Sequence, residues 1–248
     1  MGADRQEIEW QYTVPADGLG KVEEWLLGEA ERFRLAILKG SSKELEDTYY
    51  DTGDWRLYRT GYALRVRREE GGVYEATMKS LVPADGNLHR RREISEPLRS
   101  GEVETLLAAS GPVGVRLKDL ADAPKVRRIF EIRTCRQTFG LVLDMQATNL
   151  KTTQTGGSAI WVGEVALDSS EILLEAAKEP VRLARVEVEI DASTKTAFSE
   201  LEGFVKAMER DLKLRPATTS KYEVGLSATG QNPNQVMNLG LREGFGEE

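Results

Sequence analysis

The chain has 248 residues, 40% of them hydrophobic, so it is long enough to bury one substantial core in a single domain. Its net charge of −7 excludes a general nucleic-acid surface, because counterion release from phosphates needs an excess of Lys and Arg. The single cysteine, the polar N-terminus and the absence of a long apolar run predict a cytoplasmic protein without disulfides, signal segment or membrane span.

The first predicted element is a β-strand over residues 7–13, where polar and apolar side chains alternate. Period two is typical of a strand with one buried face. The polar face carries Glu7, Glu9 and Gln11, so this strand is acidic on one side. An amphipathic helix should follow, with Asp17 as its N-cap and its end near Ala30.

Cationic side chains dominate the next predicted strands. We predict strands over 34–38 and 44–51, a short plug at 55–58, and a hairpin in which a Gly-Gly turn joins 62–68 to 73–80. A further strand covers residues 88–96. Their polar face carries Arg65, Arg67, Glu75, Lys79, Arg91 and Glu93.

The second half continues with strands separated by short helices. Helices are predicted over 102–109, more weakly over 113–123, over 171–178, and from Ser193 or Thr194 onward, the last with a long apolar stripe. Strands are predicted over 126–138, 141–150, 159–168 and 183–191, with a turn at 154–157. Residues 219–222 are predicted to be extended, and the composition after Ala228 indicates a loose or partner-ordered tail.

Strands with one polar and one apolar face could form an open, solvated sheet or a closed barrel. An open sheet would carry scattered surface charges, each exposed pair contributing at most about 1 kcal/mol. Here the cations are rich in Arg, and the carboxylate pairs Glu7/Glu9 and Glu187/Glu189 put like charges on one face, where they repel. Carboxylates are good ligands for divalent cations, and Arg and Lys bind phosphate oxygens well. A barrel interior lined by both kinds of side chain would therefore bind a metal-chelated polyphosphate.

Several short motifs occur in an order that resembles the CYTH superfamily, the triphosphate tunnel metalloenzymes. They are Glu7-x-Glu9, Tyr49-Tyr-Asp-Thr52, Gly61-Tyr-Ala-Leu-Arg-Val-Arg67, Tyr74-Glu-Ala-Thr-Met-Lys79, Leu88-His-Arg-Arg-Arg-Glu93, Glu187-Val-Glu189 and Ser220-Lys221. The resemblance implies an α+β, mainly β fold: a closed eight-stranded antiparallel β-barrel with amphipathic helices outside. It implies a tunnel domain over residues 1–226 and a separate tail over 227–248.

The resemblance also implies roles for individual residues. Glu7, Glu9 and Glu189 would hold Mg²⁺ or Mn²⁺, with Glu187 beside them, while Glu75, Glu93 and Asp144 would orient the cations or bind a second metal. The triphosphate would be bound by Arg65, Arg67, Lys79, Arg91, Arg136 and Lys221, the last at one mouth. Catalysis would rest on Glu7, Glu9, Gln11 and Lys79. The implied partner is a small-molecule triphosphate; no nucleic acid or membrane is expected, and the oligomeric state, a homodimer included, stays open.

Two positions depart from the family pattern. Gln11 stands where the opening signature has a lysine, and Gly140 stands where a later strand tends to carry a glutamate. Glu164 on the following strand is a candidate to supply that carboxylate. Both departures weaken the expectation of efficient hydrolysis more than that of triphosphate binding.

Three functions remain open from the sequence. The first is metal-dependent hydrolysis of an inorganic or organic triphosphate, the second is non-catalytic binding of such anions, and the third is a class IV type adenylyl cyclase. His89 invites a role as general base, but a tunnel-rim position is the simpler interpretation. Cys135 is expected to be a small apolar filler. The four tryptophans are expected in the core: Trp10, Trp25, Trp55 and Trp161.

Overall fold

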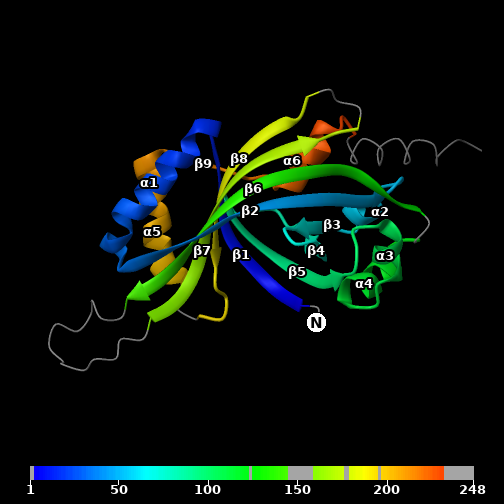
Figure 1. Ribbon diagram of the computed structural model, residues 1–248, viewed down its shortest axis with the longest axis horizontal. Coiled ribbons are helices and arrows are strands. Elements are labelled where there is room, and N and C mark those ends of the chain that lie inside the picture. Colours follow the sequence, from blue (N-terminus) through cyan, green and yellow to red (C-terminus); the bar gives the residue numbers. More distant parts are fainter. Residues whose placement is uncertain (1–2, 123–124, 145–158, 176–178, 195–196, 232–248) are drawn as a thin grey trace, which may run out of the picture.

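The computed structural model describes residues 3–122, 125–144, 159–175, 179–194 and 197–231. Eight strands form a closed ring in which every neighbouring pair is antiparallel (Figure 1). Around the ring they are β1 (Ala3–Val14), β5 (Leu88–Leu98), β4 (Val73–Ser80), β3 (Tyr62–Glu69), β2 (Leu35–Thr52), β6 (Val126–Asp144), β7 (Ala159–Leu173) and β8 (Val181–Ile190). The predicted closed, eight-stranded antiparallel ring is confirmed.

Alternation along the strands separates a polar inner face from an apolar outer face. On the outer face Trp10, Tyr12 and Val186 pack in one buried cluster against α1 (Leu19–Glu29) and α5 (Ala197–Leu212), which lie together beside the ring (Figure 1). A second cluster, around Leu64 and Met78, packs against α3 (Val103–Ala108) and α4 (Pro112–Leu120). Burial of these outer side chains stabilises the ring and leaves its interior to charged groups.

One helix lies inside the ring instead of outside it. Helix α6 (Lys221–Ala228) begins with a capping box between Ser220 and Glu223, and packs Tyr222 and Leu226 against inner side chains of β2, β6 and β7. Gly225 allows this close approach, because a Cβ there would lie 2.4 Å from the Phe130 ring. The helix therefore closes one end of the ring.

One short helix, two 3₁₀ turns and a ninth strand complete the described chain. Helix α2 (Arg56–Arg59) replaces the predicted plug, and the two-residue strand β9 (Arg215–Pro216) pairs with β1. Short 3₁₀ turns, η1 (Ala16–Gly18) and η2 (Ala30–Phe33), flank α1. Among the described helices, none has the length and apolar character needed to cross a membrane.

Several predicted boundaries are wrong. The strands predicted over 34–38 and 44–51 are one strand, β2, because a register shift between Lys39 and Ser42 carries the pairing through the polar stretch. The strands predicted before and after 139–140 are likewise one strand, β6. Asp17 lies inside η1 and makes no cap, and the segment predicted to be extended from 219 to 222 instead begins α6.

The prediction of a helix over residues 171–178 is also wrong for residues 171–175, the part of this range that the structure describes. Residues 171–173 continue β7, because they pair with β6 on one side, and 171–172 also pair with β8 on the other. The predicted turn at 154–157 and most of the predicted tail, residues 232–248, lie outside the described residues.

Candidate active site

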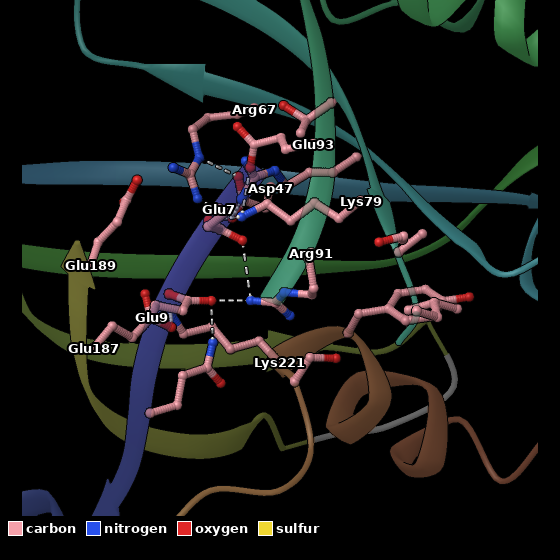
Figure 2. A pocket seen from close by; sticks show the side chains of 18 of the residues that line it. Glu7, Glu9, Asp47, Arg67, Lys79, Arg91, Glu93, Glu187, Glu189 and Lys221 are labelled. Atoms are coloured by element: carbon pink, nitrogen blue, oxygen red, sulfur yellow. Dashed lines mark hydrogen bonds and ion pairs between the residues drawn. The ribbon is translucent and has the colours of Figure 1, made fainter. Parts of the chain in front are cut away.

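The inner face of the ring surrounds a charged cavity of about 160 Å³ (Figure 2). All but one of the residues predicted for the site line it: Glu7, Glu9, Gln11, Arg65, Arg67, Glu75, Lys79, Arg91, Glu93, Arg136, Glu187, Glu189 and Lys221. The exception is Asp144, the last residue of β6, whose side chain lies outside the described part.

Strand register brings these side chains together. Glu7 is opposite Arg91, Lys79 is opposite Glu93, and Arg67 is opposite Glu75 across neighbouring antiparallel strands. Directly opposite residues project to the same face of a sheet. Residues distant in sequence therefore share the cavity wall.

One group of ion pairs joins β1, β4 and β5. The Lys79 ammonium lies 2.6 Å from Glu7 Oε1 and 2.8 Å from Glu93 Oε2, and the Arg91 guanidinium contacts Glu7 and Glu9 (Figure 2). Arg5 adds a contact of 3.1 Å to Glu93. Each carboxylate in this group is thus held by at least one cation.

A second group lies across β6, β7, β8 and α6. Arg136 donates two hydrogen bonds to Asp168, at 2.7 and 2.6 Å, and a third to Glu187 at 2.7 Å. Lys221, the first residue of α6, also contacts Asp168 and lies 2.8 Å from Glu187 Oε1. Asp168 is fully buried, so it serves as an internal counterion for two of the predicted phosphate-binding residues.

Asp47 is likewise a buried counterion, here for the arginines of β3. Arg67 donates to both carboxylate oxygens of Asp47, at 2.7 and 2.8 Å, and Arg65 lies 3.5 Å away. The two arginines lower the pKa of Asp47 far below its ordinary value, even though burial acts in the opposite direction. The cavity arginines are therefore already oriented by buried carboxylates.

Sequence reasoning missed several of these residues. Asp47 and Asp168 are buried counterions, Arg5 lines the cavity, and Tyr49 and Thr77 contribute to its wall. Arg5 has the same parity as Glu7, and Thr77 lies between Glu75 and Lys79, so period-two alternation was the available signal. Neither aspartate belongs to an i, i+2 pair of like charges, the pattern that marked the glutamates.

The carboxylates of β1 and β8 are electrostatically crowded. Glu9 lies directly opposite Glu189, and burial together with Glu7 raises the pKa of Glu9 to about 7. Burial and Glu7 also raise the pKa of Glu189. By contrast, against the effect of burial, Lys79 and Arg65 lower the pKa of Glu93 to about 2. Burial and neighbouring carboxylates thus disfavour ionisation of Glu9 and Glu189, although Arg91 contacts Glu9 and Arg5 lies 3.2 Å from Glu189, whereas cations favour ionisation of Glu93.

The chemistry of this crowded group fits a hard divalent cation. Two buried oxygens make no hydrogen bond: Gln11 Oε1, and Glu7 Oε2, which lies 3.3 Å from the Arg91 guanidinium. Both are oxygens of the type that Mg²⁺ and Mn²⁺ prefer. In the described part of the chain, no three acidic, His or Cys side chains already converge as a metal cluster, since most of these carboxylates contact cations. Glu7, Glu9 and Glu189 are the residues that could hold the ion.

The two departures from the family pattern have local structural explanations. Gln11 is 3% exposed and its amide nitrogen donates to Glu9 Oε1 at 2.7 Å, so it orients the carboxylate beside it. At Gly140 a Cβ would lie 2.4 Å from the Trp161 ring, so tryptophan fills the space of the missing side chain. Glu164 lies opposite Gly140 on β7, but it lines a neighbouring hollow and not the cavity itself.

His89 lies toward the end of the ring that α6 closes. Its Nε2 lies 2.9 Å from the carbonyl oxygen of Ala217, so Nε2 carries the proton and donates. Burial lowers the pKa of His89. It is absent from the cavity lining, which favours a structural role over a general base.

Two other sequence interpretations are wrong. Cys135 is exposed, with its Sγ 3.4 Å from Ser42 Oγ, and so is not an apolar filler. Trp161 is 43% exposed, whereas Trp10 and Trp55 are buried and Trp25 is partly buried against the core.

Comparison with known proteins identifies the family of this charged ring. A sequence model of the CYTH domain matches residues 5–225. The chain belongs to the CYTH domain family. None of the curated proteins matches the sequence.

Solved structures share the CYTH fold at low sequence identity. A Bacillus halodurans protein described as a candidate adenylate cyclase is 19% identical, with a TM-score of 0.56 over 89% of this chain and 97% of its own. A Hippeastrum protein described as a candidate adenylyl cyclase with dominant triphosphatase activity is 14% identical, with a TM-score of 0.56 over 90% of this chain and 96% of its own. The PH1819 protein of Pyrococcus horikoshii is 17% identical, with a TM-score of 0.51 over 90% of this chain and 99% of its own.

Proposed function

We propose that this CYTH protein hydrolyses a triphosphate with the help of a divalent metal ion bound in the ring. The observation that carries the proposal is the composition of the cavity wall. Among the described residues, seven basic side chains line it, namely Arg5, Arg65, Arg67, Lys79, Arg91, Arg136 and Lys221. Seven acidic side chains line it as well, namely Glu7, Glu9, Asp47, Glu75, Glu93, Glu187 and Glu189.

Charge balance argues for a metal together with the anion. A triphosphate carries several negative charges, and the cavity cations are already matched in number by carboxylates. An anion alone would leave buried negative charge uncompensated, which costs several kcal/mol per ion, on the order of the effective desolvation penalty. Glu7, Glu9 and Glu189 would hold a divalent cation whose charge would offset that excess.

The residues of the chain would bind and orient the substrate. Arg65, Arg67 and Arg136 present guanidinium groups that suit phosphate oxygens, and Asp47 and Asp168 hold them in place before binding. Lys79 and Arg91 would exchange a carboxylate partner for phosphate, which frees Glu7 and Glu9 to hold the metal. Bound Mg²⁺ or Mn²⁺ would neutralise phosphate oxygens and favour in-line attack of water on the terminal phosphorus.

The volume of the cavity limits how much of a substrate it can enclose. Sites for drug-sized ligands usually enclose roughly 300–1,000 Å³. A cavity of about 160 Å³ suits the triphosphate group alone. Any organic part of the substrate would then lie at the mouth.

The runner-up is a binding protein for such anions that does not hydrolyse them. Gln11 favours it, because this residue offers an amide in place of the lysine of the family signature and is occupied by Glu9. A class IV type cyclase is the third candidate, since nothing in the described lining of the phosphate cavity itself favours cyclisation over hydrolysis.

Phosphate release separates these functions. Tripolyphosphate, ATP and thiamine triphosphate are each incubated with the protein and Mg²⁺ or Mn²⁺, and orthophosphate, diphosphate and cyclic AMP are quantified. We expect orthophosphate from at least one substrate and none after chelation of the metal. Tight binding of all three without release would establish the binder, and cyclic AMP with diphosphate from ATP would establish the cyclase.

A further inference from the structure

A β-bulge in β7 turns one tryptophan toward the inner face of the ring. The pairing with β6 shifts between Leu141 and Val142, so that Gly163 faces Leu141 and Trp161 faces Val142. Val162 is the extra residue, and it remains in the outer core. Bulges commonly redirect a side chain beside a functional site. Simple alternation places Trp161 outside, and the bulge moves it to the inner side.

The bulge is held by the segment that follows β8. The backbone N–H of Asp191 donates to the carbonyl oxygen of Val162 at 3.0 Å, and the Thr194 hydroxyl donates to that of Trp161 at 3.0 Å. Both bulge carbonyls are therefore satisfied. The direction of Trp161 is built into the fold.

Trp161 lies on an apolar shelf made with Gly140 and Leu38. The indole ring covers Gly140, Leu38 Cβ lies 3.5 Å from where a Cβ at position 140 would be, and Leu38 is opposite Gly140 in the sheet. Leu38 is 56% exposed and Trp161 43% exposed. Two of the large exposed apolar side chains of the described surface thus lie beside Gly140.

The hollow beside Trp161 adjoins the phosphate cavity. Trp161 lines a hollow of about 450 Å³, and this hollow shares Arg5 and Glu189 with the cavity. Glu164 and Asp191 also line the hollow. An aromatic surface and carboxylates therefore lie directly beside the place proposed for the triphosphate.

We propose that Trp161 forms the wall of a ring-binding subsite, so that this chain prefers triphosphates carrying a planar aromatic group over inorganic triphosphate. The proposal rests on the proposed function, because the triphosphate must occupy the adjoining cavity. The cavity holds the phosphates, and the ring stacks on the indole, as bases do on aromatic side chains. Carboxylates beside the indole favour a ring with amino donors or positive charge.

The test compares three triphosphates with Trp161 variants. ATP carries a ring, methyl triphosphate carries an ester without a ring, and tripolyphosphate carries neither. The ratio of kcat/KM for ATP to that for methyl triphosphate is measured in the wild type and in Trp161→Ala, Trp161→Phe and Leu27→Ala. Leu27 is the matched control, because it is 56% exposed on α1, outside the ring.

We expect Trp161→Ala to lower this ratio roughly 10- to 100-fold, the range that stacking on an aromatic side chain contributes. Trp161→Phe should restore most of the ratio, and Leu27→Ala should leave it unchanged. A ratio near one in the wild type, or one that Trp161→Ala does not change, would overturn the subsite.

Calorimetric binding of ATP and methyl triphosphate to the same variants separates this proposal from the proposed function. If no substrate is hydrolysed but Trp161→Ala selectively weakens ATP binding, the subsite stands and hydrolysis fails. If methyl triphosphate and ATP are hydrolysed equally well by the wild type and by Trp161→Ala, hydrolysis stands and the subsite fails.

Discussion

Asp168 is the carboxylate on which two cavity cations converge. Replacing it with Asn keeps the size of the side chain and removes the charge that neutralises Arg136 and Lys221. We expect Asp168→Asn to lower the free energy of unfolding by about 3 kcal/mol, because one partner of a buried ion pair is lost. Urea unfolding measures the change.

The matched control is Glu171→Gln on the same strand, whose partner Arg182 is exposed. It should change the free energy of unfolding by less than about 1 kcal/mol. Saturating tripolyphosphate should stabilise Asp168→Asn more than the wild type, since phosphate replaces the lost counterion. Equal stabilisation of the two proteins would argue that Arg136 and Lys221 do not bind phosphate.

Glu9 gives a prediction about pH. Its pKa rises from 4.5 to about 7 in the folded state, chiefly through burial and Glu7. Between pH 4.5 and about 7, Glu9 in the folded protein therefore keeps a proton that it has lost in the unfolded chain. The free energy of unfolding that this proton contributes is lost as pH rises through this range.

Without divalent metal, the free energy of unfolding of the wild type should therefore fall across this range relative to that of Glu9→Gln, which has no proton to release. Urea unfolding of both proteins at a series of pH values gives the difference. A difference that does not vary with pH would show that Glu9 is ionised throughout and that the crowding of carboxylates is relieved in another way.

At the scale of elements, α6 closes the ring because Gly225 lets it approach Phe130. Gly225→Ala inserts a methyl group into this contact, and we expect it to lower the free energy of unfolding by about 1–3 kcal/mol. The same substitution at Gly203, an exposed position of α5 with open space around it, should raise the free energy of unfolding by about 0.5–1 kcal/mol. Thermal unfolding compares the two, and destabilisation by both would point to a general intolerance of the helices to alanine.

The alternation of polar and apolar residues along the strands predicts most of the residues that line the cavity, and it fails at identifiable places. It holds along β1, β3, β4 and β8. Every odd-numbered side chain lines the cavity from Glu7 to Gln11, from Arg65 to Arg67, from Glu75 to Lys79 and from Glu187 to Glu189. It fails at Trp161, because no local residue pattern marks a bulge that the segment after β8 fixes.

Two further errors come from tertiary contacts that override local preference. Residues 171–173 resemble a helix start after two serines, but β6 and β8 pair with that segment. Lys221 was predicted to lie at one mouth in an extended segment, whereas the capping box of Ser220 and Glu223 starts a helix there that aims Lys221 at Asp168 and Glu187. Local sequence determines the strands, and the partner strands determine where they end.

Across the whole molecule, the closed ring encloses many side chains of both charge signs. Hydrophobic clusters outside the ring supply the burial that stabilises such an interior. The inner charges compensate each other through ion pairs, and we propose that a metal-bound anion would replace some of those contacts.

The most direct test is metal-dependent phosphate release from triphosphates by the wild type and Glu7→Gln. Glu7 contacts Lys79 and Arg91 and carries a buried oxygen without a hydrogen bond. We predict orthophosphate release by the wild type with Mg²⁺ or Mn²⁺ and a loss of at least about 100-fold in Glu7→Gln, because the metal loses an ionised ligand. Circular dichroism verifies that the variant is folded. Full metal-dependent activity in folded Glu7→Gln would contradict the proposal that Glu7 holds the divalent metal ion needed for hydrolysis.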